Sequence, residues 1–195
     1  MVQRRRVKNW LRAVALTISG AEGAQIVELA VTLPVLVVVF VGIYDFGQAF
    51  NTKQKLTLAT REGARIAASQ STSDLTNSRP GSILAVRDVV DAYLTANKVN
   101  DCGLGSANPP APANWIWQFT ATGCSYGNLV LTVDRGHTFT TTASSGNTIT
   151  VEATQVTLSY PYQWQFNRAI GVLIPGANYA GVTQIQIVSV MQNLN

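Results

Sequence analysis

A glycine followed five residues later by a carboxylate stands at the start of a long apolar run. Gly23 precedes Ala24, Glu28 lies four residues beyond Ala24, and apolar residues continue almost unbroken to Tyr44. Hydrolysis of the peptide bond between Gly23 and Ala24 would leave an ammonium group on Ala24, on the helical face that carries Glu28. The new charge would pair with the carboxylate of the same subunit or of a neighbour. The alternative is an uncut signal anchor whose Glu28 extends toward the membrane interface.

Residues 24–44 have the length and composition of a membrane-spanning helix. At about 1.5 Å per residue, this segment covers about 31 Å, which matches a hydrocarbon core of roughly 30 Å. Glu28 is its only charged residue. A carboxylate costs roughly 2.5–3.5 kcal/mol at the centre of such a helix and less near its end. A charge at this position therefore indicates a specific partner.

The charges that flank the span predict its orientation. Residues 1–23 form a basic leader with five Lys or Arg residues and one acidic residue, Glu22. Because positive flanks stay in the cytoplasm, the N-terminus is predicted inside and every residue after Tyr44 outside. The leader alone accounts for the net charge of +4, since residues 24–195 hold nine basic and nine acidic side chains. A neutral exported part argues against a nucleic-acid-binding surface.

Residues 45–69 are predicted to continue the helix outside the membrane. They contain no proline, and mostly small residues recur at three- and four-residue steps: Ala49, Thr52, Leu56, Ala59, Gly63 and Ile66. This face can approach another backbone closely. Pro34, inside the span, should kink the helix locally because it removes a backbone donor. Gly47 and Ala49 also have the spacing of a signal-peptidase site, but the apolar run exceeds the roughly 7–15 residues of a signal peptide.

Four charged residues on this helix are candidates for contacts between subunits. Asp45 follows the span at the expected lipid boundary, and Arg61, Glu62 and Arg65 lie in the outer part. The alternative for the last three is a solvated helix face with a local ion pair between Glu62 and Arg65, since residues three apart are neighbours on a helix.

Residues 70–195 are predicted to form an extracytoplasmic α/β domain. An apolar stripe at helical spacing indicates an amphipathic helix from residue 83 to about residue 97. Alternating apolar and polar residues indicate strands near 115–120, 129–133, 148–160 and 182–191. The predicted fold class is therefore α+β: a long N-terminal membrane-spanning helix, a second helix and a C-terminal antiparallel sheet of about four strands.

Two of these strands have unusual patterns. In 148–160 the apolar residues move from odd to even positions after Ala153, which predicts a bulge or a change of sheet face. In 182–191 they occupy both phases, which predicts burial on both faces. The connection 160–181 is long and apolar, and we expect it to pack on the sheet as a hairpin or to contact a neighbour or the bilayer surface.

Cys102 and Cys124 are the only cysteines in the chain. On the oxidising side of a membrane we expect one disulfide between them, worth about 2–4 kcal/mol, the alternative being two buried thiols. The chain has one histidine, His137, and no Cys-x-x-Cys spacing, so no metal site is expected. His137 also lacks a Ser or Cys partner in a recognisable catalytic pattern. We therefore predict that the protein is not an enzyme and has no catalytic residues and no cofactor.

Three ordered segments of the long helix resemble the TadE family of pseudopilins from tight-adherence (Flp-type) pilus systems. They are ELAVTLP at 28–34, GIYDFGQAF at 42–50 and ATREGARIAA at 59–68. The leader, with its glycine and fifth-position carboxylate, is similar to the class III leader of type IV prepilins, which a membrane aspartic peptidase cuts after the glycine. Gln48 departs from the family, which commonly has arginine there, and Ala24 is smaller than the first residue of mature major pilins.

This resemblance implies a structural minor pilin or pseudopilin, cut between Gly23 and Ala24, in which Glu28 is an assembly carboxylate. The implied partners are membrane lipid, a prepilin peptidase, other pilins and the pilus assembly platform. The implied location is the cytoplasmic membrane, or a pilus that serves in cell adhesion. The alternative function is a single-pass anchored extracytoplasmic binding domain that does not polymerise. We expect neither a nucleic acid nor a small-molecule substrate as a partner.

Overall fold

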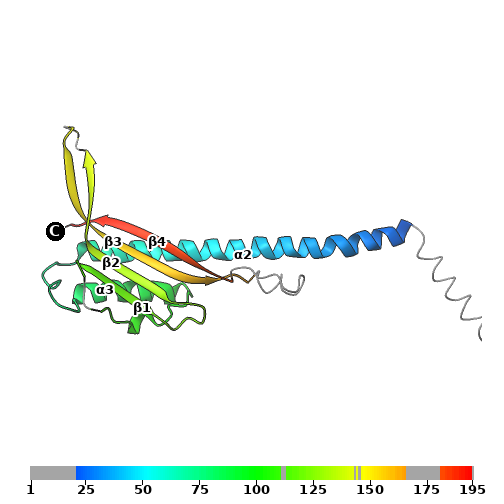
Figure 1. Cartoon of the computed structure of the whole chain (residues 1–195), viewed down its shortest axis with the longest axis horizontal. Helices are drawn as coiled ribbons and strands as arrows, with labels where there is room; N and C mark the ends of the chain where they lie inside the picture. Colours follow the sequence, from blue (N-terminus) through cyan, green and yellow to red (C-terminus); the bar gives the residue numbers. More distant parts are fainter. Residues whose placement is uncertain (1–20, 111–112, 143, 145, 166–180, 195) are drawn as a thin grey trace, which may run out of the picture. The chain divides into compact units, whose positions relative to one another are not determined.

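The computed structural model describes residues 21–110, 113–142, 144, 146–165 and 181–194 (Figure 1). The elements follow in the order α2 (Ala21–Ser69), α3 (Gly81–Ala96), the 3-10 helix η1 (Leu104–Ser106), β1 (Ile116–Ala121), β2 (Leu129–Thr142), β3 (Thr148–Gln163) and β4 (Val182–Gln192). The predicted α+β layout of a long apolar helix, a second helix and a four-stranded antiparallel sheet is confirmed. Leader residues 1–20 and residues 166–180 of the connection after β3 lie outside the described residues.

Contacts divide the described residues into two units. The first contains residues 21–45, which form the apolar part of α2. The second contains residues 46–165 and 181–194, which form the rest of α2, α3, η1 and the sheet. Residues 46–69 of α2 are therefore part of the folded domain.

The sheet has the strand order β1-β2-β3-β4, and all neighbouring strands are antiparallel. β1 pairs with residues 129–134 of β2, and β4 pairs with residues 153–163 of β3. β2 and β3 are longer than their outer neighbours, and residues 138–142 pair with residues 148–152 beyond the four-stranded part. We call this two-stranded end the arm, and Figure 1 shows it projecting from the rest of the sheet.

The predicted irregularity in the third strand is present, but the extra residue lies on the partner strand. The β2–β3 register shifts between Asp134 and His137, where β2 has one residue more than β3. β3 itself runs uninterrupted from Thr148 to Gln163. Ala153 and Thr154 are both buried at this step. The bulge on β2 thus accounts for the change of phase on β3.

The core lies between the sheet and two helices. Its largest buried side chains come from α2, α3, η1 and the strands, and include Trp117, Phe119, Leu56, Ile83, Leu94 and Leu104. Gly63 lies where α2, α3 and the sheet meet, because a Cβ atom there would be 2.7 Å from Val90 Cγ2 and 3.8 Å from Val156 Cγ1. The close approach predicted for the small residues of this face therefore occurs within the domain itself.

Side chains from outside α3 stabilise both of its ends. The N-cap residue, Pro80, makes no side-chain cap, and Asp74 instead accepts hydrogen bonds from Ser82 N at 2.8 Å and from Ser82 Oγ at 2.7 Å. Desolvation raises the pKa of Asp74, but the hydrogen bonds from Ser82, the backbone N–H of Asp74 and the charge of Arg135 together hold the pKa below its ordinary value. At the other end, Lys55 Nζ donates to the Asn97 carbonyl at 2.9 Å. Both charges complement the helix dipole.

β4 is buried on only one face, so the prediction of burial on both faces is wrong. Ile187 is buried, whereas Val188 and Val190 are 51% and 42% exposed. β4 is also an edge strand of the sheet. Its apolar residues in both phases therefore form one core face and one exposed apolar row.

Candidate functional site

The predicted cleavage point lies in the described part of α2. The helix begins at Ala21 and therefore includes both Gly23 and Ala24. Ala24 and Glu28 are both exposed, and their four-residue spacing places them on the same face. The two ion pairs formed among the described residues do not involve Glu28. Its carboxylate is thus accessible to an ammonium group of this chain or of another.

The apolar side chains between Ala24 and Tyr44 face outward around the helix. Ile26, Phe40 and Ile43 are among the large apolar residues that stay exposed. α2 is long and apolar enough to cross a membrane, and none of its most apolar stretch is buried. Such a surface is typical of a helix that lipid or other apolar helices surround, because exposed apolar area costs about 25 cal/mol per Å² in water. The structure is consistent with a single-pass membrane anchor.

α2 continues through Pro34 without a break. Proline cannot donate a hydrogen bond to the carbonyl four residues earlier. Two residues before it, Thr32 Oγ1 donates to the carbonyls of Glu28 and Leu29 at 2.9 and 3.3 Å. The proline therefore does not end the helix, and the local kink predicted there stays a prediction.

Asp45, the residue after the predicted span, is buried. Only 1% of its surface is exposed, and it interacts with other residues of the chain. The sequence predicted that Asp45 lies at the lipid boundary or in a contact between subunits. Its part in subunit contacts stays a prediction, and any such contact would have to compete with the interactions already present.

Aromatic side chains attach the first residue of the folded domain to the sheet. Phe46 and Trp164 pack edge to face with ring centroids 5.3 Å apart, and Tyr162 packs on Trp164 at 5.2 Å. Trp164 Nε1 also donates to Thr183 Oγ1 at 2.8 Å. These contacts hold residue 46 of α2 against the end of β3 and the beginning of β4.

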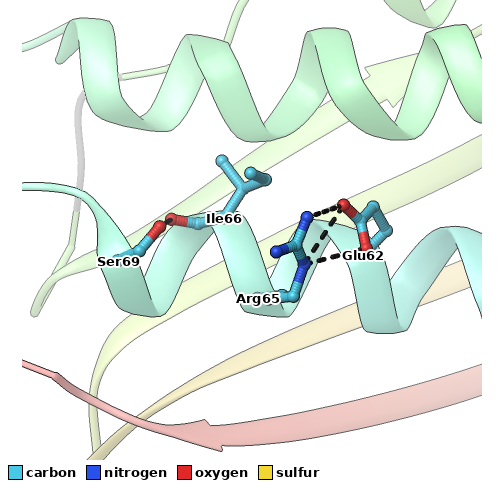
Figure 2. Close-up of polar contacts among 4 residues, drawn as sticks. All are labelled: Glu62, Arg65, Ile66 and Ser69. Atoms are coloured by element: carbon cyan, nitrogen blue, oxygen red, sulfur yellow. Dashed lines mark hydrogen bonds and ion pairs between the residues drawn. The ribbon is translucent and has the colours of Figure 1, made fainter.

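The charged outer part of α2 carries a local ion pair. Arg65 Nη2 lies 2.5 Å from Glu62 Oε1, and Arg65 Nε donates to both carboxylate oxygens (Figure 2). The side chain of Arg65 is 64% exposed, and Arg61 is exposed as well. The local alternative anticipated for Glu62 and Arg65 is thus present, and contacts of Arg61, Glu62 and Arg65 with other subunits stay a prediction.

Cys102 and Cys124 lie at disulfide distance, with their Cα atoms 4.7 Å apart. The pair joins the loop after α3 to the turn between β1 and β2. Gly123 N donates to the Cys102 carbonyl at 2.8 Å, and a Cβ atom at Gly123 would lie 2.6 Å from that oxygen. The close approach of the two segments therefore depends on a glycine at this position.

A buried arginine that the sequence reasoning missed lies beside the arm. Arg135 is 6% exposed, and its Nη2 donates to the Gln70 carbonyl at 3.0 Å, while Nε and Nη1 have no partner among the described residues. Burial lowers the pKa of the guanidinium, and the charge of Asp74 acts in the opposite direction. With His137 and Glu152, Arg135 borders a hollow of about 320 Å³.

The strand pattern contains the signal that would have placed Arg135. Leu129, Leu131 and Val133 point into the core, and Arg135 continues their odd-numbered phase. A charged residue in an inward phase requires compensation. The pattern therefore predicts a special environment at this position, although not the partner.

The hollows of the domain differ in the side chains that line them. No group of three or more potential metal ligands occurs in the part of the chain that the structure describes. A groove of about 330 Å³ is lined by residues of α2, of the loop after α3, of the turn between β1 and β2 and of β3, including Lys55, Lys98, Tyr126 and Gln163. Its lining contains no His, Asp or Glu side chain that could act as a general base.

Comparison with known proteins connects α2 to a family. Residues 23–65 match the family model described as TadE-like protein, which confirms the predicted resemblance. The matched residues all lie in α2 and include Gly23, Glu28 and Gly63. No curated protein and no solved structure matches the chain. The match associates the protein with Tad pilus systems, in which TadE-like proteins are generally structural rather than enzymatic.

Proposed function

We propose that this protein is a structural minor pilin or pseudopilin that takes part in assembly of a tight-adherence (Flp-type) pilus. The observation that carries the proposal is the match of residues 23–65 to the TadE-like family. These residues lie in one helix whose apolar side chains between 24 and 44 are exposed. Lipid covers such a surface in a membrane, and neighbouring apolar helices would cover it in a pilus, so one helix serves both states.

Cleavage after Gly23 is the step that would prepare the helix for assembly. It would remove the basic leader and create an ammonium group on Ala24, one helical turn from Glu28. An ion pair between Glu28 and Ala24, within a subunit or between neighbours, would compensate the carboxylate in an apolar bundle. A prepilin peptidase, other pilins and the assembly platform are the partners that this sequence of events requires.

The proposed location is the cytoplasmic membrane, with the N-terminus inside and the domain after Tyr44 outside, before incorporation into a pilus. The basic leader supports this orientation. The approach of Cys102 to Cys124 supports it independently, because disulfides persist in oxidising compartments.

A second candidate function is a membrane-anchored binding domain that does not polymerise. The groove beside Lys55 and Gln163 favours it, since a binding domain needs a concave surface and a passive anchor needs no helix partner. The two candidates differ in what they require of Glu28. A passive anchor gains nothing from the charge, whereas a pilin helix uses it in assembly.

Glu28→Gln tests the role of this carboxylate because it removes the charge at nearly constant shape. In a strain with this variant as its only copy, we expect a processed, membrane-stable protein, absence of pili and loss of crosslinks to pilus components. N-terminal sequencing should find Ala24 as the first residue. Gln25→Ala is the matched control, since it removes a nearby exposed polar group and keeps the charge; it should leave piliation intact.

Two outcomes would contradict the proposal. Normal piliation with Glu28→Gln as the only copy would reject the assembly role of the carboxylate. Retention of Met1 in cells with an active prepilin peptidase, or a mature chain that begins at Phe50, would reject cleavage after Gly23.

A further inference from the structure

We propose that the arm of one copy of this protein adds as a strand to the outer edge of β4 in a second copy. The interaction concerns the extracytoplasmic domain alone and goes beyond the proposed function. It requires neither cleavage of the leader nor the exposed apolar part of α2.

The arm is a two-stranded ribbon that the rest of the sheet does not support. β1 begins opposite Asp134, and β4 ends opposite Ala153, so among the described strands residues 138–142 and 148–152 pair with each other alone. One hydrogen bond, from Asn193 N to the Glu152 carbonyl at 3.1 Å, joins its root to the segment after β4. A two-stranded ribbon is only marginally stable in water, so the arm gains most from a further strand.

The two faces of the arm have different chemistry. Antiparallel partners share a face, and Phe139 lies opposite Val151 while Thr141 lies opposite Ile149. Phe139 is 39% and Ile149 is 46% exposed, so this face presents an apolar row to solvent. The opposite face carries only polar residues: Thr138, Thr140, Thr142, Thr148, Thr150 and Glu152.

β4 has complementary properties. It lies at the edge of the sheet, and β3 is the one described strand that pairs with it. Its sequence over Val182–Gln192 contains no charged residue and no proline, which are the usual means of preventing an exposed edge from pairing. The exposed side chains of Val188 and Val190 add an apolar row beside this edge.

A second copy of the chain fits both surfaces at once. When an arm strand pairs with β4 and their exposed apolar faces align, the row of Phe139 and Ile149 comes beside that of Val188 and Val190. Glu152 is the only charged residue on these strand segments, so no like charges oppose each other. Pairing of arm with arm would instead leave the edge and the apolar row of β4 in water.

The proposed contact is head to tail, because the arm and β4 are different surfaces of the same chain. Each pair of copies keeps one unused arm and one unused β4 edge. Further copies can therefore add without a closed symmetry.

Self-association of the full-length protein in detergent micelles tests the proposal, with analytical ultracentrifugation over a range of concentrations. Phe139→Lys places a charge on the apolar row of the arm, and Val190→Lys places the same charge on β4. Each should weaken association about tenfold or more, since each loses an apolar contact and introduces a charge into it. Thr120→Lys adds the same charge to an exposed position of β1 and should leave association unchanged. Association through α2 is common to all variants.

A mixture of the two variants distinguishes the proposed contact from pairing of identical surfaces. Phe139→Lys keeps an intact β4 and Val190→Lys keeps an intact arm, so mixing differently tagged copies should restore one contact and give a dimer of the two variants, which has no intact arm or β4 edge left for further copies. Arm-to-arm pairing predicts no recovery. Unchanged association of the single variants, or no recovery in the mixture, would overturn the proposal. Should Phe139→Lys fail to fold by thermal unfolding, Ile149→Thr is the milder arm variant and should weaken association in the same direction.

Discussion

Replacing Gly63 by alanine should destabilise the folded domain through one contact between α2 and α3. The added Cβ atom would lie 2.7 Å from Val90 Cγ2, whereas ordinary contacts measure 3.4–4 Å. Val90 is fully buried, and its β-branched side chain has one strongly preferred rotamer in a helix, so it cannot easily turn away. The helices must therefore separate, and overpacking of this kind costs about 1–3 kcal/mol.

Helix propensity acts against this cost. Alanine is favoured over glycine by about 0.8–1.0 kcal/mol in a helix interior. Gly47 supplies the matched control because it lies in the same helix, and a Cβ atom there would have no neighbour within 4 Å. Gly47→Ala should gain stability from the higher helix propensity of alanine, without a steric clash like that with Val90. The free energies of unfolding of the two variants should then differ by the packing cost, about 1–3 kcal/mol.

Denaturant unfolding of the full-length protein in detergent, followed by near-UV circular dichroism, measures this difference. We expect Gly63→Ala to unfold at a lower denaturant concentration than Gly47→Ala. Adding Val90→Ala to Gly63→Ala removes the obstructing methyl group, so the double variant should lose less stability than the sum of the single changes. Equal midpoints for Gly63→Ala and Gly47→Ala would show that α3 does not approach α2 this closely.

Three further changes test the contacts that position the loops. Asp74→Asn should lower the free energy of unfolding by about 0.5–2 kcal/mol at neutral pH, because Ser82 loses a charged acceptor. Since the folded pKa of Asp74 is lowered, the difference should begin to shrink as the pH falls below about 4 and should disappear below the folded pKa; a pH-independent difference would contradict this origin. Unreduced protein should take up no thiol label, and two labels before reduction would disprove the bridge between Cys102 and Cys124. Joint replacement of the two cysteines by serine should lower the free energy of unfolding by about 2–4 kcal/mol. Gly123→Ala should cost about 1–3 kcal/mol because its Cβ atom would lie 2.6 Å from the Cys102 carbonyl oxygen, and an unchanged denaturation midpoint would contradict the close approach.

The types of the elements could be predicted because local periodicity decides them. The absence of proline from 45–69 and the recurrence of small residues predicted a continuous helix, and α2 extends to Ser69. In β1, alternation placed Trp117 and Phe119 on one face, and both are buried. These patterns record which side of an element meets the core, so a single sequence reveals them.

The exposed row of β4 could not be predicted because it depends on what lies beside the strand. Ile185 and Ile187 occupy one phase of the strand and Val188 and Val190 the other, a pattern that fits a strand between two layers as well as an edge strand with a partner outside the chain. The exposure of Val188 and Val190 in the folded chain distinguishes these cases. The contact between Asp74 and Ser82 was missed for a related reason, since the loop brings the carboxylate back to a helix whose own N-cap is a proline.

The packing of α2 within its own domain limits how it can meet another subunit. From the sequence, the small residues of its outer part could pack within the domain or against another subunit. In the structure, Ala59, Gly63 and Ala67 are buried against α3 and the sheet. The side left for a neighbour carries Leu58, Arg61 and Arg65, and Arg65 is already paired with Glu62. Exposed ion pairs contribute only about 0–1 kcal/mol.

In the proposed assembly, residues 24–44 supply most of the driving force, because most of the large apolar side chains that α2 exposes lie there. In that segment Glu28 is the only charged residue, so it can specify register between helices that are otherwise uniformly apolar. Apolar contacts alone do not select one register, whereas a buried carboxylate strongly disfavours every arrangement that leaves it without a partner. The carboxylate would thus contribute specificity more than affinity, which is why Glu28→Gln should spare insertion into the membrane and prevent assembly.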